Sequence, residues 1–92
     1  MAKLSDDELR AAVARLPGWV VDADALVKRY TFPTFPEGVY FVDRVAEAAE
    51  AAGHHPDIDI RYVTITLRLS THDEGGVTAK DVALAEQIEA LA

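Results

Sequence analysis

Two adjacent histidines, His54 and His55, stand near the middle of the sequence, and His72 is the third histidine of the chain. Imidazole is the side chain best matched to proton transfer near neutral pH. Glu50 precedes His54 by one helical turn, so its carboxylate can reach that imidazole if the helix continues that far. A carboxylate beside a histidine fixes its tautomer and raises its basicity. These four side chains predict an acid–base cluster.

Each of these residues also has an ordinary structural interpretation. Glu50 fits a solvated charge on a helix face, and a histidine near the C-terminal end of a helix is a favourable partner for the helix dipole. His72 fits a surface residue beyond the end of a strand. Asp81 follows Thr78 at the spacing of a capping box. Three histidines and an acid also suggest a metal site, but their spacing differs from the HExxH pattern, and no metal is predicted.

Composition restricts the class of site further. The 92 residues contain no cysteine, which excludes disulfides, thiolate zinc sites, iron–sulfur clusters and a cysteine nucleophile. Nine basic and sixteen acidic residues give a net charge of −7, so no nucleic-acid partner is expected. The amino end lacks the apolar core of a signal peptide, and no apolar run approaches the roughly 20 residues that span a bilayer. The sequence predicts a soluble, cytoplasmic protein without a membrane partner.

The elements that must position the histidines follow from periodicity. A first helix starts at a Ser5–Glu8 capping box and stops at Pro17-Gly18. A hairpin is expected over residues 19–32, a second helix over 37–52, and a second hairpin over 57–69. The last helix follows Thr78. The apolar face predicted for the second helix consists of Val39, Val42, Val45, Ala46, Ala49 and Ala52.

The order α-ββ-α-ββ-α predicts an α+β fold. It is a single-domain two-layer sandwich, with a four-stranded antiparallel sheet and three helices on one face. Ninety-two residues suffice for one hydrophobic core. The hairpin that follows Pro56 returns near its own start, so we expect it to bring His72 towards His54 and His55.

Spaced motifs carry a resemblance to a known family. The run Glu50-x-x-x-His54-His55-Pro56, followed at fixed spacing by Tyr62, His72 and Asp81, resembles the signature of the pterin-4a-carbinolamine dehydratases, also called 4a-hydroxytetrahydrobiopterin dehydratases. Leu16-Pro17-Gly18-Trp19, Phe41-x-x-Arg44-Val45-Ala46 and Ser70-Thr71-His72 resemble further family positions. The sequence departs from the family pattern at Gly53, Ile58 and Val63, none of which is a histidine. Residues 1–92 are therefore expected to form one domain of this type.

The resemblance implies a hydro-lyase that dehydrates 4a-hydroxytetrahydrobiopterin to quinonoid dihydropterin and water by histidine acid–base catalysis. The reaction recycles the pterin cofactor of aromatic amino acid hydroxylases and needs neither a metal nor a cofactor. The implied catalytic set is Glu50, His54, His55 and His72, in which Glu50 orients His54. The implied substrate-binding set is Pro56, Thr71, Asp73, Glu74 and Asp81. Trp19 is expected in the core.

The family also includes members without dehydratase activity, which implies an alternative function. In that alternative the chain is a non-catalytic dimerisation or assembly module, similar to a coactivator, on the same fold. A pure binding module has no need for Glu50 and three histidines together, which favours the enzyme. The resemblance further implies a homodimer or tetramer and a functional link to a pterin-dependent hydroxylase.

Overall fold

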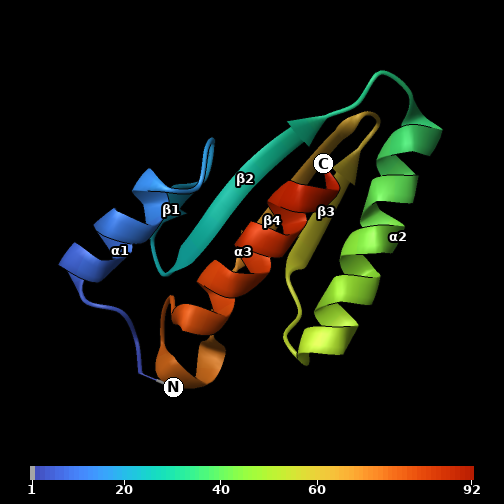
Figure 1. The fold of residues 1–92 in the computed structure, drawn as a ribbon. Coiled ribbons are helices and arrows are strands. Elements are labelled where there is room, and N and C mark those ends of the chain that lie inside the picture. Colours follow the sequence, from blue (N-terminus) through green and yellow to red (C-terminus); the bar gives the residue numbers. More distant parts are fainter. Residues whose placement is uncertain (1) are drawn as a thin grey trace.

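The computed structural model describes residues 2–92, and its elements follow the predicted order α-ββ-α-ββ-α (Figure 1). The helices are α1 (Asp6–Ala14), α2 (Phe35–Ala52) and α3 (Ala79–Leu91), and the strands are β1 (Val20–Asp22), β2 (Ala25–Thr31), β3 (Asp57–Arg61) and β4 (Thr64–Leu69). A short 3₁₀ helix, η1 (His72–Glu74), lies between β4 and α3. Both predicted capping boxes are present, Ser5 with Glu8 and Thr78 with Asp81.

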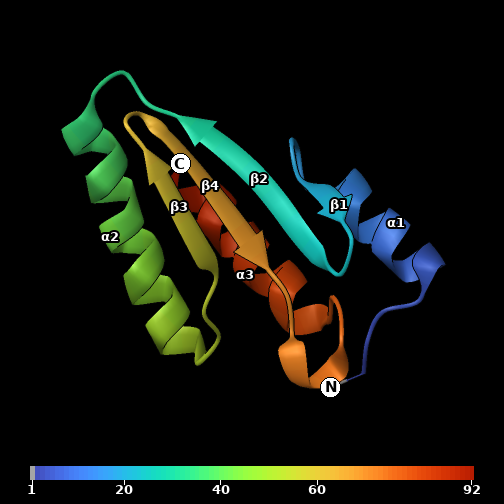
Figure 2. The ribbon, with the colours of Figure 1, turned by 180° about the vertical axis from the view of Figure 1, so that it is seen from behind.

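The four strands form one antiparallel sheet in the order β1-β2-β4-β3. In β4 the side chains alternate, so that Ile65, Leu67 and Leu69 are fully buried whereas Thr66 and Arg68 are partly exposed. Helix α3 lies across one face of the sheet, and the view from behind shows the strands uncovered (Figure 2). The predicted two-layer arrangement is therefore confirmed, with the apolar face of β4 turned towards the helices.

All three helices contribute to one hydrophobic core. Its buried members are Ala12, Leu16, Trp19, Leu26, Tyr30, Phe41, Val45, Ala49, Ile65, Leu67, Leu69, Val77, Val82, Leu84, Ala85 and Ile88. Trp19 is among them, as predicted. None of the helices within residues 2–92 is both long and apolar enough to cross a membrane.

The buried face of α2 differs from the predicted one. The helix begins two residues earlier than expected, at Phe35, because the Thr34 side chain accepts a hydrogen bond from the backbone N–H of Glu37 and caps it. Its buried residues are Gly38, Phe41, Val45 and Ala49, whereas Val39, Ala46 and Ala52 are exposed. The three- and four-residue steps from Gly38 through Phe41 to Ala49 follow one stripe of the helix. The buried face of α2 is thus the one that contains Phe41, which the spacing of the alanines and valines did not identify.

Glu89 of α3 connects the first hairpin to the last helix. Its Oε1 accepts hydrogen bonds from Trp19 Nε1 at 3.0 Å and from the Tyr30 hydroxyl at 2.6 Å, and it forms an ion pair with Lys28. Burial by itself raises the pKa of the Glu89 carboxyl, but the hydrogen bonds from Lys28, Tyr30 and Trp19 outweigh burial, and the pKa lies below its ordinary value. The ionised form of Glu89 therefore stabilises the fold.

Replacing Glu89 by glutamine should lower the free energy of unfolding by about 1 kcal/mol at neutral pH, because charge-assisted hydrogen bonds become neutral ones. Since the pKa of Glu89 is depressed in the folded protein, its contribution is present above the ordinary value of 4.5 and is lost as the pH falls below it. Urea denaturation at several pH values measures this. Glu86→Gln, which removes only an exposed contact with Arg15, is the matched control. Equal effects of the two variants would contradict the role given to Glu89.

Candidate active site

His54 and His55 lie immediately after the C-terminal end of α2. Gly53 closes the helix with φ +63°, a left-handed conformation that glycine adopts without strain, as its position in the sequence predicts. Its backbone N–H contacts the carbonyl oxygens of Ala49 and Glu50. The chain therefore leaves the helical direction at Gly53, and the two histidines stand in an irregular segment before β3.

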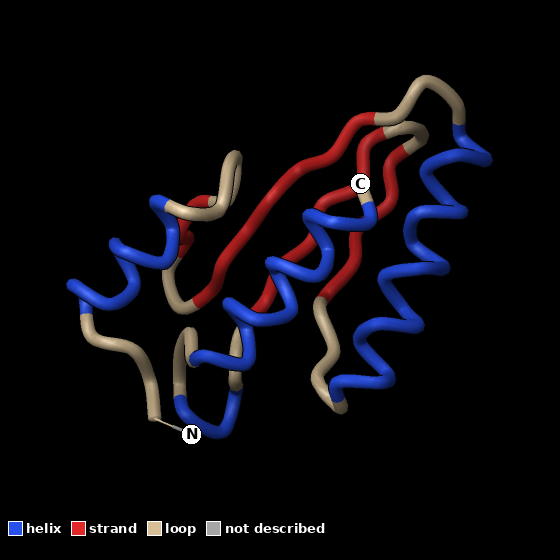
Figure 3. The backbone as a smooth tube through the Cα atoms, in the orientation of Figure 1, coloured by secondary structure: helices blue, strands red, loops and turns tan. Residues whose placement is uncertain are grey.

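The second hairpin brings His72 to the same end of the molecule. Asp57 pairs with Arg68, so the start of β3 and the end of β4 lie side by side. The segment with η1 and the loop between α2 and β3 occupy the same end of the fold (Figure 3). Strand β4 ends at Leu69, as predicted, and His72 lies beyond it as the first residue of η1. A bridge between Thr71 and Gly76 closes this turn.

All three histidines line one hollow of about 320 Å³. Its lining residues are Gly53, His54, His55, Ser70, Thr71, His72, Asp73 and Lys80. This volume is at the lower end of the range for small-molecule sites, which suits a compact ligand. A larger hollow of about 700 Å³ lies between α1 and α3, but no histidine lines it. The chemistry of the side chains therefore identifies the smaller hollow as the candidate active site.

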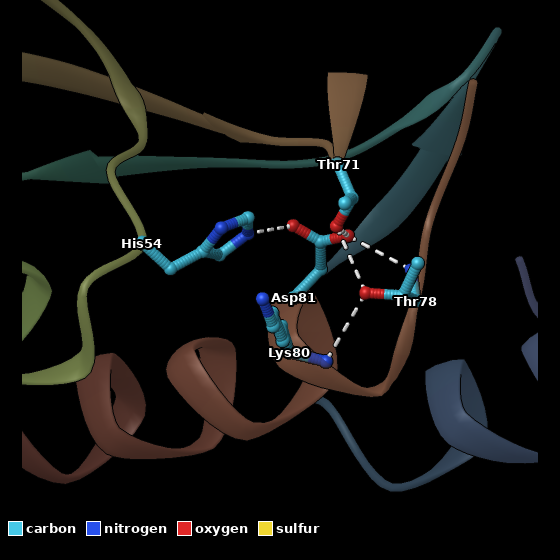
Figure 4. Close-up of polar contacts among 5 residues, drawn as sticks. All are labelled: His54, Thr71, Thr78, Lys80 and Asp81. Atoms are coloured by element: carbon cyan, nitrogen blue, oxygen red, sulfur yellow. Dashed lines mark hydrogen bonds and ion pairs between the residues drawn. The ribbon is translucent and has the colours of Figure 1, made fainter. Parts of the chain in front are cut away.

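His54 is held by a buried carboxylate. Its Nε2 lies 2.5 Å from Oδ1 of Asp81, and the two side chains are 12% and 0% exposed (Figure 4). Because a carboxylate only accepts hydrogen bonds, Nε2 of His54 carries the proton in this contact. In the neutral imidazole Nδ1 of His54 is then the nitrogen that can accept a proton. The geometry fixes both the tautomer and the direction of the ring.

The other oxygen of Asp81 is also fully used. Oδ2 accepts a hydrogen bond from the backbone N–H of Thr78 and another from the Thr71 hydroxyl, both at 2.9 Å (Figure 4). Since the one hydroxyl proton of Thr71 goes to Asp81, the Thr78 hydroxyl is the donor in the 2.8 Å contact between the two threonines. Three donors compensate the burial of this charge. Asp81 therefore combines the predicted capping role with a direct contact to a histidine.

Glu50 contacts His55 instead of His54. Its Oε1 lies 2.7 Å from Nε2 of His55, and both side chains are exposed, at 81% and 63%. The expected contact with His54 is wrong, because Gly53 turns the chain out of the helix before the four-residue relation is completed. Exposed ion pairs of this kind contribute little to stability. The carboxylate partner of His54 is Asp81, which is farther from it in the sequence.

The remaining predicted substrate-binding residues divide into two groups. Thr71 and Asp73 line the hollow, whereas Pro56 and Glu74 do not. Two lining residues, Ser70 and Lys80, were absent from the sequence-based site. Lys80 directly precedes Asp81 in the capping box, and this position is the signal that could have identified it. No group of three or more metal-ligating side chains is arranged around a common point within residues 2–92.

Comparisons with known proteins show which family this chain resembles. Residues 2–91 match the model of the family described as "Pterin 4 alpha carbinolamine dehydratase". A protein of Mycobacteroides abscessus, provisionally named pterin-4-alpha-carbinolamine dehydratase, is 55% identical over 97% of this chain and 95% of its own length. A protein of Thermomicrobium roseum with the same provisional name is 49% identical over 100% of this chain and 99% of its own.

Two solved structures share the fold. The crystal structure of a protein from Brucella melitensis, titled transcriptional coactivator/pterin dehydratase, superimposes with a TM-score of 0.93 at 32% identity and covers 98% of both chains. A pterin dehydratase-like protein, described as a RuBisCO assembly factor in the alpha-carboxysome, gives a TM-score of 0.68 at 24% identity. It covers 80% of this chain and 86% of its own. The second similarity is one of fold alone.

Proposed function

This chain belongs to the pterin 4 alpha carbinolamine dehydratase family, and we propose that it dehydrates 4a-hydroxytetrahydrobiopterin to quinonoid dihydropterin and water. The observation that carries the proposal is the convergence of His54, His55 and His72 on one hollow, with His54 held by the buried Asp81. A cytoplasmic location and a functional link to a pterin-dependent hydroxylase remain predictions from the sequence.

The reaction needs two proton transfers. Hydroxide is a poor leaving group, so an acid must protonate the 4a-oxygen as the bond between C4a and oxygen breaks. A base must remove the proton on N5 as the C4a=N5 double bond forms. The acid gives one proton to the departing water, and the base takes one proton from N5. Exchange of protons with solvent then returns the acid and the base to their starting states.

The contacts of each histidine suggest its role. His54 has Nδ1 free to accept a proton, and the adjacent Asp81 carboxylate would stabilise the imidazolium that results, so we assign it the N5 proton. His72 is exposed on η1 and would protonate the 4a-oxygen. His55, oriented by Glu50, would position that oxygen. Glu50 does not line the hollow itself, and in this proposal it acts through His55 and not through His54.

A direct assay tests the proposal. Freshly generated 4a-carbinolamine dehydrates without a catalyst, so the measured quantity is the increase in quinonoid dihydropterin formation above that background. We expect the native protein to accelerate the reaction in proportion to its concentration, and the heat-unfolded protein to leave the background unchanged. Folded protein without acceleration would overturn the proposal.

The alternative function, a non-catalytic dimerisation or assembly module, is favoured by one surface. Strand β3 is an edge strand, and its Ile58 and Ile60 are 37% and 42% exposed. Such an edge offers unpaired backbone groups to another chain. We also propose a homodimer or tetramer on this ground. Light scattering on the purified protein measures the mass, and the mass of a single chain would contradict the oligomer.

A further inference from the structure

Lys80 occupies a position in the candidate active site to which no role has yet been given. It is the second residue of α3 and lines the same hollow as the three histidines. Figure 4 shows its side chain leaving the first turn of α3 beside Asp81 and on the side of His54. Lys80 is the one lysine or arginine among the lining residues of this hollow. The protein as a whole is acidic, with a net charge of −7.

The charge of Lys80 has no partner within residues 2–92. Lys28, by comparison, is paired with Glu89. Asp73 lines the same hollow as Lys80, but the two form no ion pair. The hollow therefore contains one cation and one anion that each remain available to a ligand.

Ser70 adds a third available group. Its hydroxyl oxygen is buried and has no hydrogen-bond partner, and Ser70 also lines the hollow. A buried polar group without a partner is rare in folded proteins, and a bound ligand or water commonly supplies the missing contact. By contrast, His54, His55 and Thr71 already have partners. Apart from His72 and Nδ1 of His54, which the proposed reaction uses for proton transfer, the side chains of the hollow with free hydrogen-bonding capacity are Ser70, Asp73 and Lys80.

We propose that Lys80 is a specificity-determining residue that binds the 4-oxo group of the pterin ring, an inference that rests on the proposed function. The pyrimidinone edge of a pterin presents one acceptor, the 4-oxo oxygen, beside two donors, N3–H and the 2-amino group. An ammonium group only donates and a carboxylate only accepts, so Lys80 matches the acceptor and Asp73 matches the donors. The Ser70 hydroxyl can complete either contact.

Binding of the 4-oxo group by Lys80 would also determine where the reacting carbon, C4a, lies. C4, which carries the 4-oxo group, is bonded directly to C4a, where the hydroxyl departs. A residue that holds the 4-oxo oxygen therefore positions C4a one bond away, within reach of the histidines that line the same hollow. Lys80 does not contact the reacting atoms in this arrangement, so its contribution is to ring recognition and orientation.

A pair of ligands that differ only at C4 tests the inference. 6-Hydroxymethylpterin has the 4-oxo group, and 2,4-diamino-6-hydroxymethylpteridine replaces it with an amino group. Fluorescence titration measures the binding of both to the native protein and to Lys80→Gln, Lys80→Arg and Lys80→Glu. Lys3→Gln is the matched control, because it removes the same charge from a residue outside this hollow.

We expect Lys80→Gln to bind the 4-oxo ring about tenfold more weakly, since a charge-assisted hydrogen bond becomes a neutral one, and to bind the diamino ring almost unchanged. Lys80→Arg should retain the preference for the 4-oxo ring, and Lys80→Glu should reverse it. In the dehydration assay Lys80→Gln should raise KM with little change in kcat, the signature of binding made equally in ground and transition state.

The outcomes separate this inference from the proposed function. Native protein that binds the pterin and accelerates dehydration, together with Lys80→Gln that retains the native ring preference, would overturn the role of Lys80 alone. Native protein that binds neither ring and does not accelerate the reaction would overturn both. An effect of Lys3→Gln equal to that of Lys80→Gln would assign the change to overall charge and would also overturn the inference.

Discussion

Replacing His72 by alanine should slow carbinolamine dehydration by about 10²- to 10⁴-fold, because a positioned acid or base contributes about that factor. His72 is exposed on η1 and supports no part of the core, so the circular dichroism spectrum and the melting temperature should stay at their native values. The measurement is kcat for dehydration above the uncatalysed background, paired with thermal melting of the same sample.

His55→Ala is the natural companion to this variant. His55 is also exposed, and its side chain contacts Glu50. We expect a large loss of dehydration with an unchanged melting temperature here as well. Glu50→Gln provides the graded control, because it keeps a hydrogen-bond acceptor beside His55 while removing the charge, and it should lose less activity than His55→Ala. If either histidine variant lost fold and activity together, the site assignment would fail.

Replacing Asp81 by asparagine is expected to reduce both activity and stability. The carboxylate of Asp81 is fully buried and accepts from His54, Thr71 and Thr78. Loss of the charge weakens these contacts by about 2 kcal/mol in total, a typical value for hydrogen bonds to a buried charged group. The rate of dehydration should fall by about tenfold to a hundredfold, the usual loss when a residue that orients a functional histidine is removed.

A second variant separates these two effects of Asp81. Thr71→Val removes one donor to Asp81 and leaves the carboxylate against His54, so it should lower stability with a smaller loss of activity. Urea denaturation measures the stability of both variants, and ¹⁵N chemical shifts of the His54 ring report its tautomer. We expect the proton on Nε2 in the native protein and in Thr71→Val, and a mixture of tautomers in Asp81→Asn. An unaltered His54 tautomer in Asp81→Asn would contradict the positioning role.

Most of the fold could be predicted from local sequence signals, because the ends of its helices depend on residues that are close together in the sequence. Ser5 with Glu8, Thr78 with Asp81, and Gly53 after α2 mark element ends by their own hydrogen bonds or backbone preference. The apolar face of α2 was predicted incompletely. Its sequence is rich in alanine and valine at several spacings, and only packing against the sheet selects the stripe that contains Phe41.

The site was predicted at the level of its histidines and less well at the level of their partners. The hairpin geometry brings His72 to His54 and His55, and the sequence indicated this through the order of the strands. The partner of His54 depends on where α3 begins relative to the end of α2, which is a tertiary relation without a local signal. Ser70 and Lys80 lie next to predicted site residues in the sequence, at the Ser70-Thr71-His72 motif and directly before Asp81. That position alone does not show that either side chain lines the hollow.

In the proposed mechanism, the two roles of Asp81 connect catalysis to local opening of one helix end. Helix termini open locally at a free energy below that of global unfolding, and the first turn of α3 is held by the same carboxylate that orients His54. Whenever that turn opens, His54 loses its hydrogen bond to Asp81 while the rest of the chain is still folded. Activity should therefore decline on warming before the cooperative melt, in step with amide hydrogen exchange at the start of α3.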